Sequence, residues 1–417
     1  MTRMTRTRTL IHLTVVVALA VAWLAVLPRP AGHASVPDPG RPAVRVLDYD
    51  LGDRAMTVGG FHALDRRGMP TEELAPIELT GRVYAPADAA GRGLPLVVVA
   101  HGSFWSCADE GAGTVEMGWP CRTPLTGIDS DRGYDRLGRT LAARGMVVVS
   151  VGANGVNAGE LGDVADRARA KVVFRHLAMW RDLVELGTGP LVGAFRSART
   201  GAAVTPDLDG AVDLRNVGLV GHSRGGRGMM WAAAEKNRGQ VPEGVRIRAV
   251  FGLAAAGPPF MDKNVRRVQV TDTPLMTWSG TCDATGRDEY NRLARRRGNP
   301  VNIGITVHGA NHNNLNTRWA AGGGAGGEDD AYHPAGRPGR CSDGFSDETS
   351  RTLGPRAERT VATTYVRAFL ARYLQHDRSF DAILRGRTHP VAGLTQVDVR
   401  RYRAADVATG NDRTTRP

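Results

Sequence analysis

The stretch LVGHSRGGRG, residues 219–228, decides the fold class of this chain. Within this stretch an apolar segment of strand character ends at a Gly-x-Ser-x-Gly turn. A segment whose apolar residues have the spacing of a helix follows. A serine at such a strand-to-helix turn has a strained backbone and holds its hydroxyl above the edge of the sheet. The chain contains 52 glycines, so the motif alone is weak. Ser223 becomes a candidate nucleophile only if other segments supply a base, an acid and donors for an oxyanion.

Around this turn, apolar segments of strand length alternate with amphipathic segments of helix length. The strand-like segments are 77–86, 94–102, 146–154, 217–223, 247–256, 274–280 and 301–309. The helix-like segments are 134–145, 163–186, 228–237, 288–297 and 358–375. Buried strands separated by helices indicate a mostly parallel sheet with helices on both faces. We expect an α/β domain over residues 35–378, followed by a partly flexible C-terminal extension, 379–417.

The N-terminus has the composition of an export signal. Basic residues without any acid precede an apolar run over residues 10–27, and small residues lead up to Ser35. This layout predicts a cleaved signal peptide over residues 1–34. An uncleaved anchor is the alternative, because the run is nearly long enough to span a bilayer. After cleavage we expect no stable membrane insertion, and in either case the rest of the protein is expected outside the cytoplasm.

The formal net charge of +12 does not indicate a nucleic-acid-binding protein. All but three of the 54 basic residues are arginines, and they are scattered among acidic residues with few short blocks. Nucleic-acid-binding domains gather basic residues on one face or along one helix. We therefore expect no nucleic-acid partner.

Two histidines near the end of the expected sheet are candidates for the base. His308 continues the strand-like segment 301–309 and is interpreted as a packed edge residue. His312 follows in a loop that can carry an imidazole over the sheet edge to Ser223. The H-x-x-x-H spacing would suit a metal site only on a helix, which this sequence does not favour. We expect no metal and assign the base to His312.

An acid should hold that imidazole in its tautomer and stabilise the imidazolium. Asp283 stands just after the strand-like segment 274–280, where the required loop begins. Asp288 is the alternative, but it lies in the helical pattern 288–297 and is expected to face solvent. We assign the acid to Asp283.

A pair of backbone N–H groups must receive the oxyanion, and losing one costs on the order of 100-fold or more in rate. One is expected from Arg224, which directly follows the serine at the start of a helix. The other is expected from the turn at Gly102, with Ser103 as the predicted donor and Phe104 as the second choice.

The four cysteines predict disulfides, because an even count is typical of exported chains. We expect the pairs Cys107–Cys121 and Cys282–Cys341. The first would close the long loop after the Gly102 turn, and the second would tie the loop of the base to the acid. Four cysteines allow three pairings, and buried free thiols remain an alternative. No C-x-x-C spacing suggests a metal site.

Taken together, these motifs resemble the α/β-hydrolase superfamily over residues 45–376. The segments that carry the resemblance are RGYDRLGRTLAARGMVVVSVGAN (132–154), VGLVGHSRGG (217–226), GTCD (280–283) and HGANHNNLN (308–316). They are similar to secreted actinobacterial serine hydrolases of the polyester-hydrolase, cutinase-like and platelet-activating-factor acetylhydrolase branch. The chain order serine, aspartate, histidine is the order of that fold. The resemblance implies acyl-enzyme chemistry on carboxylic esters without a cofactor.

Two features bear on the substrate. The stretch 103–133 is longer than the compact loop of the cutinase-like enzymes, so the resemblance does not extend to substrate choice. Too few residues separate 247–256 from 274–280 for a helical cap, so we expect no large cap domain and an open cleft. Its candidate walls are Phe104, Trp105 and Phe260.

Three functions fit these observations. The first is a secreted hydrolase of carboxylic esters, acting on small-molecule, lipid or polymer substrates. The second is an extracellular acyltransferase that uses the same three residues and an alcohol acceptor. The third is a non-catalytic cell-surface binding protein on a hydrolase scaffold, which the intact set of three residues disfavours.

Overall fold

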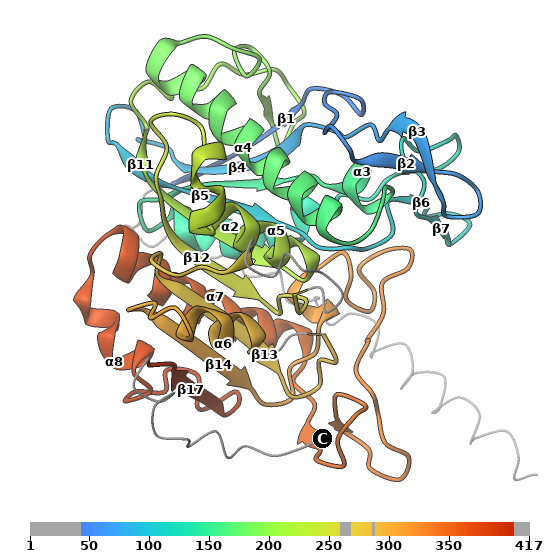
Figure 1. Cartoon of the computed structure of the whole chain (residues 1–417), viewed down its shortest axis with the longest axis vertical. Coiled ribbons are helices and arrows are strands. Elements are labelled where there is room, and N and C mark those ends of the chain that lie inside the picture. Colours follow the sequence, from blue (N-terminus) through green and yellow to red (C-terminus); the bar gives the residue numbers. More distant parts are fainter. Residues whose placement is uncertain (1–42, 259–267, 286–287, 404–417) are drawn as a thin grey trace, which may run out of the picture. The chain divides into compact units, whose positions relative to one another are not determined.

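The computed structural model describes residues 43–258, 268–285 and 288–403. Within them, ten strands form one sheet in the order β10-β1-β4-β9-β5-β11-β12-β13-β14-β17 (Figure 1). Their bounds are Arg196–Ser197, Val44–Asp50, Thr80–Pro86, Val147–Val151, Leu94–Ala100, Val212–His222, Ile247–Leu253, Leu275–Gly280, Asn302–Val307 and Val397–Arg401, in that order. The neighbours from β9 to β14 are all parallel, and the pairings outside them are antiparallel.

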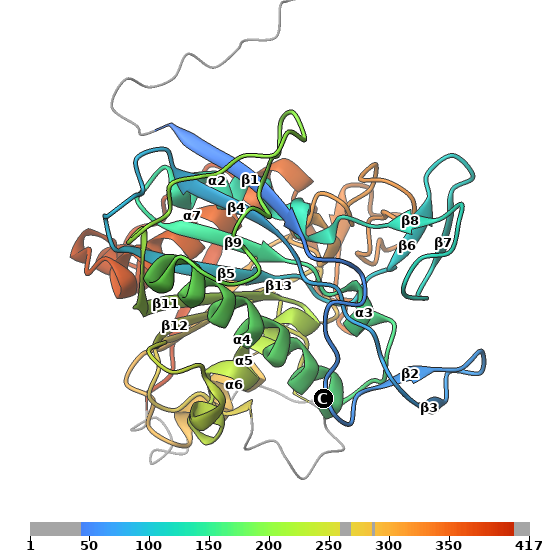
Figure 2. The ribbon, with the colours of Figure 1, turned by 90° about the horizontal axis from the view of Figure 1, so that it is seen from above.

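Helices cover both faces of the sheet, as the sequence predicted (Figure 2). One face carries α4 (Asp163–Leu186), α5 (Arg224–Ala233) and α6 (Glu289–Arg295), and the other carries α2 (Asp135–Ala142) and α7 (Pro355–Leu374). Successive strand residues point to opposite faces. In β5, Leu96 and Val98 therefore pack with the first helix group, whereas Val97 and Val99 pack with the second. A sheet buried on both faces explains why the central strands are continuous apolar runs.

Shorter elements surround this core. They are β2 (His62–Leu64) with β3 (Pro70–Leu74), β6 (Cys107–Asp109) with β7 (Thr114–Glu116) and β8 (Thr126–Gly127), β15 (Arg340–Cys341) with β16 (Ser350–Arg351), and the helices α3 (Asn154–Asn157) and α8 (Asp381–Leu384). Short 3₁₀ helices lie at Ser130–Tyr134, Glu235–Gln240, Asn313–Leu315 and Arg378–Phe380.

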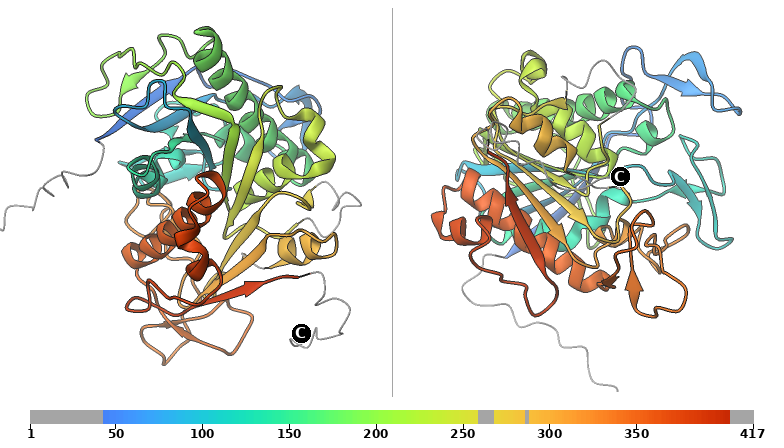
Figure 3. Two further views of the ribbon diagram at one scale, coloured as in Figure 1. Left: turned by 90° about the vertical axis from the view of Figure 1, so that its left-hand side faces the viewer. Right: turned by 60° about the horizontal axis from the view of Figure 1, so that its bottom comes forward.

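The α/β class and the mostly parallel sheet are confirmed, and α4 has the bounds that its periodicity predicted. The C-terminal segment differs from expectation, because β17 extends the sheet beyond residue 378 by pairing with β14. Figure 3 shows it as the dark red strand at the sheet edge. Only Val397 of this strand is buried and its neighbours are polar, because an edge strand needs apolar residues on one face only. The sequence VDVRR therefore gives a weak signal.

The structure contains the two expected disulfides, Cys107–Cys121 and Cys282–Cys341. Disulfides persist in oxidising compartments and are rare in the reducing cytoplasm. The predicted signal peptide, 1–34, and Phe260 lie outside the described residues. Among the helices of the described residues, none is long and apolar enough to cross a membrane.

Removing the Cys282–Cys341 disulfide should destabilise the fold more than removing the other pair. The two bonds close chain separations of 59 and 14 residues, and the chain-entropy model assigns them about 4 and about 3 kcal/mol. Urea unfolding of the Cys282→Ala/Cys341→Ala and Cys107→Ala/Cys121→Ala variants measures both losses. An unchanged free energy of unfolding in the first variant would contradict the expectation.

Candidate active site

Ser223 occupies a strained turn between β11 and α5. Its φ of 57° and ψ of −129° fall outside the regions that L-residues favour. Such backbone strain costs on the order of 1–3 kcal/mol and persists only where the surroundings impose it. The N–H of Ser223 donates to the Leu253 carbonyl at 3.1 Å, and its own carbonyl accepts from Ala256 at 3.0 Å. The last residue of the neighbouring strand β12 and the segment that follows it thus hold both backbone groups of Ser223 in place.

Glycines make this turn sterically possible. A Cβ on Gly225 would lie 2.4 Å from the Ala100 carbonyl oxygen, and a Cβ on Gly226 would lie 2.5 Å from the Ala255 Cβ. Any side chain at these positions would push α5 away from β5 and β12. The Gly-x-Ser-x-Gly-Gly pattern is therefore required by packing around Ser223, and not only by the turn itself.

His312 and Asp283 form a buried pair on the loops that follow β14 and β13. His312 Nδ1 lies 3.2 Å from Asp283 Oδ2, and the second carboxylate oxygen accepts from the Thr285 N–H at 2.7 Å. The exposed fractions of His312 and Asp283 are only 7% and 2%. The strands β13 and β14 run parallel to β11, so their carboxyl ends lie on the same side of the sheet. This brings the His312–Asp283 pair to the side that carries Ser223.

Aromatic packing places the His312 ring beside the serine turn. Its ring centroid lies 4.7 Å from that of His222, the residue immediately before Ser223. The buried indole of Trp319 packs on both rings, 4.6 Å from His222 and 6.4 Å from His312. Its Nε1–H donates to the Ser130 hydroxyl at 3.0 Å. Sequence reasoning missed Trp319, because a single tryptophan in a glycine-rich stretch has no motif around it.

The electrostatics of the site favour the protonated form of His312. Burial alone would lower the pKa of this imidazole, but the charge of Asp283, the hydrogen bond to Asp283 and the charge of Asp330 together raise it above its ordinary value. Asp330 lies at the surface, and partial desolvation of its carboxyl raises its own pKa. The pair can therefore hold a proton on the imidazole in a site that water scarcely reaches.

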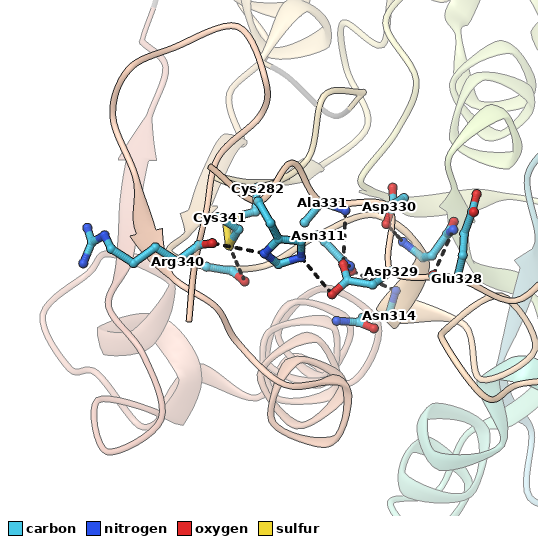
Figure 4. A network of polar contacts seen from close by, with 12 residues as sticks. Cys282, Asn311, Asn314, Glu328, Asp329, Asp330, Ala331, Arg340 and Cys341 are labelled. Atoms are coloured by element: carbon cyan, nitrogen blue, oxygen red, sulfur yellow. Dashed lines mark hydrogen bonds and ion pairs between the residues drawn. A yellow bond between two sulfur atoms is a disulfide. The ribbon is translucent and has the colours of Figure 1, made fainter. Parts of the chain in front are cut away.

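A polar network holds the loop that carries His312 (Figure 4). The Asn311 side chain donates to Asp329 at 2.7 Å, and the Asn313 N–H donates to Asp330 at 2.9 Å. The disulfide Cys282–Cys341 lies beside this network and joins it to the residue before Asp283. Both residues that flank His312 are thus fixed to acidic side chains of the following segment.

Glu358 binds the loop that carries His312 from the helix α7. It lies in the first turn of α7 and is fully buried. Its Oε2 accepts from the Asn311 N–H at 3.1 Å and from the Asn314 side chain at 3.4 Å. Burial raises the pKa of this carboxyl well above its ordinary value. Glu358 could not be singled out from the sequence, because an acid in the first turn of a helix is common.

The two expected oxyanion donors lie close to Ser223. Arg224 begins the ten-residue helix α5, so its N–H is one of the free donors at a helix N-terminus. A Cβ on Gly102 would lie 2.3 Å from the Ser223 Cβ and 2.9 Å from the Arg224 nitrogen. The turn that carries Ser103 is therefore packed directly against the serine. Within the described part of the chain, neither the Ser103 N–H nor the Arg224 N–H has a hydrogen-bond acceptor.

The expected cleft residues lie at different depths. Phe104 stacks on Trp319 with ring centroids 5.1 Å apart. Trp105 is 39% exposed, and a Cβ on Gly326 would lie 2.5 Å from its Cδ1, so its indole packs on that glycine. Phe104 thus packs with the aromatic residues around His312, whereas Trp105 lies at the surface and packs against the loop 320–327.

The alternative residues make other contacts. His308 bonds to Asp398 of β17 at 2.7 Å, at the edge of the sheet. Asp288 accepts from Tyr402 at 2.8 Å and pairs with Arg292 at 3.0 Å, so it faces the C-terminal segment as well as solvent. No group of three or more metal-ligating side chains with suitable geometry occurs in residues 43–258, 268–285 and 288–403.

No protein-family model matches the chain, and a search of curated proteins finds no significant relative. The assignment of chemistry to this site therefore depends on its geometry.

The His312 imidazole should titrate above its ordinary value of about 6.5 in the folded protein. Replacing Asp283 by Asn removes the charge and the best acceptor, so the midpoint should move to lower pH. NMR of the ring protons against pH, assigned with a His312→Gln variant, measures it. Asp288→Asn is the matched control and should leave the midpoint unchanged. A wild-type midpoint below 6.5, or one insensitive to Asp283→Asn, would show that the pair is not coupled.

Proposed function

We propose that the protein is a serine hydrolase that cleaves carboxylic esters through Ser223, His312 and Asp283. The observation that carries the proposal is that three features lie together at the carboxyl ends of the parallel strands. They are a strained serine at a strand-to-helix turn, a buried histidine–aspartate pair beside it, and two backbone N–H groups packed against the serine. A turn with a purely structural role needs no hydroxyl and no such pair.

The order of the elements supports an α/β-hydrolase fold. The serine follows β11, the aspartate follows β13 and the histidine follows β14, so the chain order is serine, aspartate, histidine. That order distinguishes the α/β-hydrolase arrangement from the chymotrypsin and subtilisin arrangements, in which the same three residue types follow other orders.

The proposed reaction has two halves. His312 removes the proton of the Ser223 hydroxyl while the oxygen attacks the ester carbonyl, and Asp283 stabilises the imidazolium. The N–H groups of Ser103 and Arg224 stabilise the oxyanion. When the carbon–oxygen bond to the alcohol breaks, His312 returns the proton to the leaving alkoxide and an acyl-serine remains. Water then attacks this ester with His312 as base, and the acid leaves as the serine regains its proton.

We infer that this reaction takes place outside the cytoplasm. Both disulfides are in the domain that carries the site, and the N-terminal segment has the pattern of an export signal. The substrates are therefore esters available outside the cell, such as lipids, acylated small molecules or polyesters. The reaction uses only side chains, backbone N–H groups and water.

The Ser223→Ala variant should fold and be exported normally, while its turnover of chromogenic esters falls by several orders of magnitude. His312→Ala should lose as much, and the double variant should be little worse, because the residues act as one unit. A panel of p-nitrophenyl esters of graded acyl length measures both the loss and the acyl preference.

Two controls sharpen this test. Asp283→Asn should cost turnover heavily, whereas Asp288→Asn should not. Residual activity of Ser223→Ala within tenfold of wild type, or an active His312→Ala beside an inactive His308→Ala, would contradict the assignment. Added alcohol separates hydrolysis from acyl transfer, because a transferase would convert most of the acyl groups to the new ester.

A further inference from the structure

The turn after β5 is held from behind by two side chains. The Ala153 N–H donates to His101 Nε2 at 2.9 Å, so the ring proton of this imidazole is on Nδ1. His101 Nδ1 then donates to the Gly102 carbonyl at 2.9 Å. Burial lowers the pKa of His101 to about 4, so the ring is neutral near pH 7. The side-chain amide of Asn157 donates to the same carbonyl at 3.1 Å.

Asn157 binds two carbonyls of this turn at once. It lies at the end of α3 and is buried, with 3% of its surface exposed. Its Nδ2 donates to Gly102 at 3.1 Å and to Phe104 at 3.3 Å. Together the two bonds bracket Ser103, the expected oxyanion donor. The site does not otherwise explain why a buried amide should face this segment.

Arg169 determines which way the Asn157 amide points. The guanidinium donates to Asn157 Oδ1 from the buried face of α4. Arginine has no acceptor atom, so the amide oxygen must face Arg169 and the amide nitrogen must face the turn. Burial lowers the pKa of Arg169 to about 10, which still leaves it protonated at neutral pH.

Because the peptide group is planar, the direction of the Gly102 carbonyl determines the direction of the Ser103 N–H. In a trans peptide the carbonyl and the following N–H point in opposite directions. The described residues have cis bonds only at Trp119–Pro120 and Thr123–Pro124, so the Gly102–Ser103 bond is trans. Two donors fix the Gly102 carbonyl, and the Ser103 N–H is therefore fixed on the side away from Asn157. A Cβ on Gly102 would lie 2.3 Å from the Ser223 Cβ, so this peptide lies directly against the serine.

We propose that Asn157, oriented by Arg169, is a positioning residue that aims the Ser103 N–H at the oxyanion. The inference rests on the proposed ester hydrolysis and adds a relay from α4 through α3 to that donor. Arg169 also packs against α5, because a Cβ on Gly228 would lie 2.5 Å from the Arg169 Cβ. The arginine thus connects the helix that begins after Ser223 with the turn that carries Ser103.

The decisive variant is Asn157→Asp. It keeps the shape of the side chain and the acceptor for Arg169, but it places a carboxylate oxygen against two carbonyl oxygens. The repulsion should rotate the Gly102–Ser103 peptide. Loss of one oxyanion donor costs about 100- to 1,000-fold in kcat, so a misdirected donor should cost about 10- to 100-fold. KM should change less than about threefold, because the oxyanion exists only after attack.

A transition-state analogue separates positioning from general damage. A trifluoromethyl ketone forms a tetrahedral adduct with the serine that carries an oxyanion, so its Ki should rise by the same factor as kcat falls. The matching ether, which cannot form the adduct, should bind with an unchanged Ki. A merely structural role for Asn157 would weaken both compounds alike.

Asn299→Asp is the matched control. Asn299 is almost as buried as Asn157, and its amide donates to the carbonyls of Val270 and Thr273 at 3.0 and 2.8 Å. It precedes β14, at the opposite end of the parallel strands from Ser223. This variant introduces the same chemical change. Its melting temperature should fall, while its kcat should stay unchanged.

A second pair of variants tests the relay if Asn157→Asp does not fold. Arg169→Lys keeps a donor for the amide oxygen and should retain most of kcat, whereas Arg169→Met should lose about tenfold or more. Equal kcat in the two, or an Asn157→Asp enzyme with wild-type kcat and ketone affinity, would overturn this inference while the wild type still hydrolyses esters. A wild type without any esterase activity would instead overturn the proposed function, and this inference with it.

Discussion

The strained backbone of Ser223 is the constraint on which the rest of the site depends. A φ of 57° is unfavourable for a residue with a side chain, so the surroundings must hold this conformation in place. The bonds to Leu253 and Ala256 and the close packing of α5 onto the neighbouring strands do so. That packing leaves no room for side chains at the adjoining positions, including Gly102. The turn that carries Ser103 can contact Ser223 only because Gly102 has no side chain. The nucleophile and the oxyanion donor are therefore positioned by one close contact.

The positioning of His312 requires a different device, because its loop is neither strand nor helix. Buried polar groups must be hydrogen-bonded, and the loop contains several asparagines that are almost fully buried. Their bonds to Asp329, Asp330 and Glu358 replace the backbone ladder that a regular element would supply. The disulfide beside them connects this segment to the residue before Asp283. Removing it should therefore loosen the imidazole as well as lower the stability of the fold.

Much of this arrangement follows from local sequence. Continuous apolar runs predicted the parallel strands, and glycines around Ser223 predicted the turn, because both signals lie within a few adjacent residues. The supporting groups could not be predicted in this way. Asn157 and Arg169 are single polar residues on helical segments, and only the fold shows that they meet behind Gly102. The edge strand β17 was missed for a related reason, since it buries one face and its exposed residues are polar.

The carboxyl groups around His312 explain how a buried base can accept a proton. Asp283 and Glu358 are buried, whereas Asp330 lies exposed at the surface, and buried carboxylates that lie close together cannot all carry charge. Burial raises the pKa of Glu358, and its Oε2 accepts hydrogen bonds from Asn311 and Asn314. Asp283 is the carboxyl group that bonds directly to His312. In the proposed reaction, proton transfer from Ser223 creates an imidazolium beside this carboxylate. The field is strong because little water screens it, so the same burial that makes the isolated imidazole a poor base makes the pair an effective one.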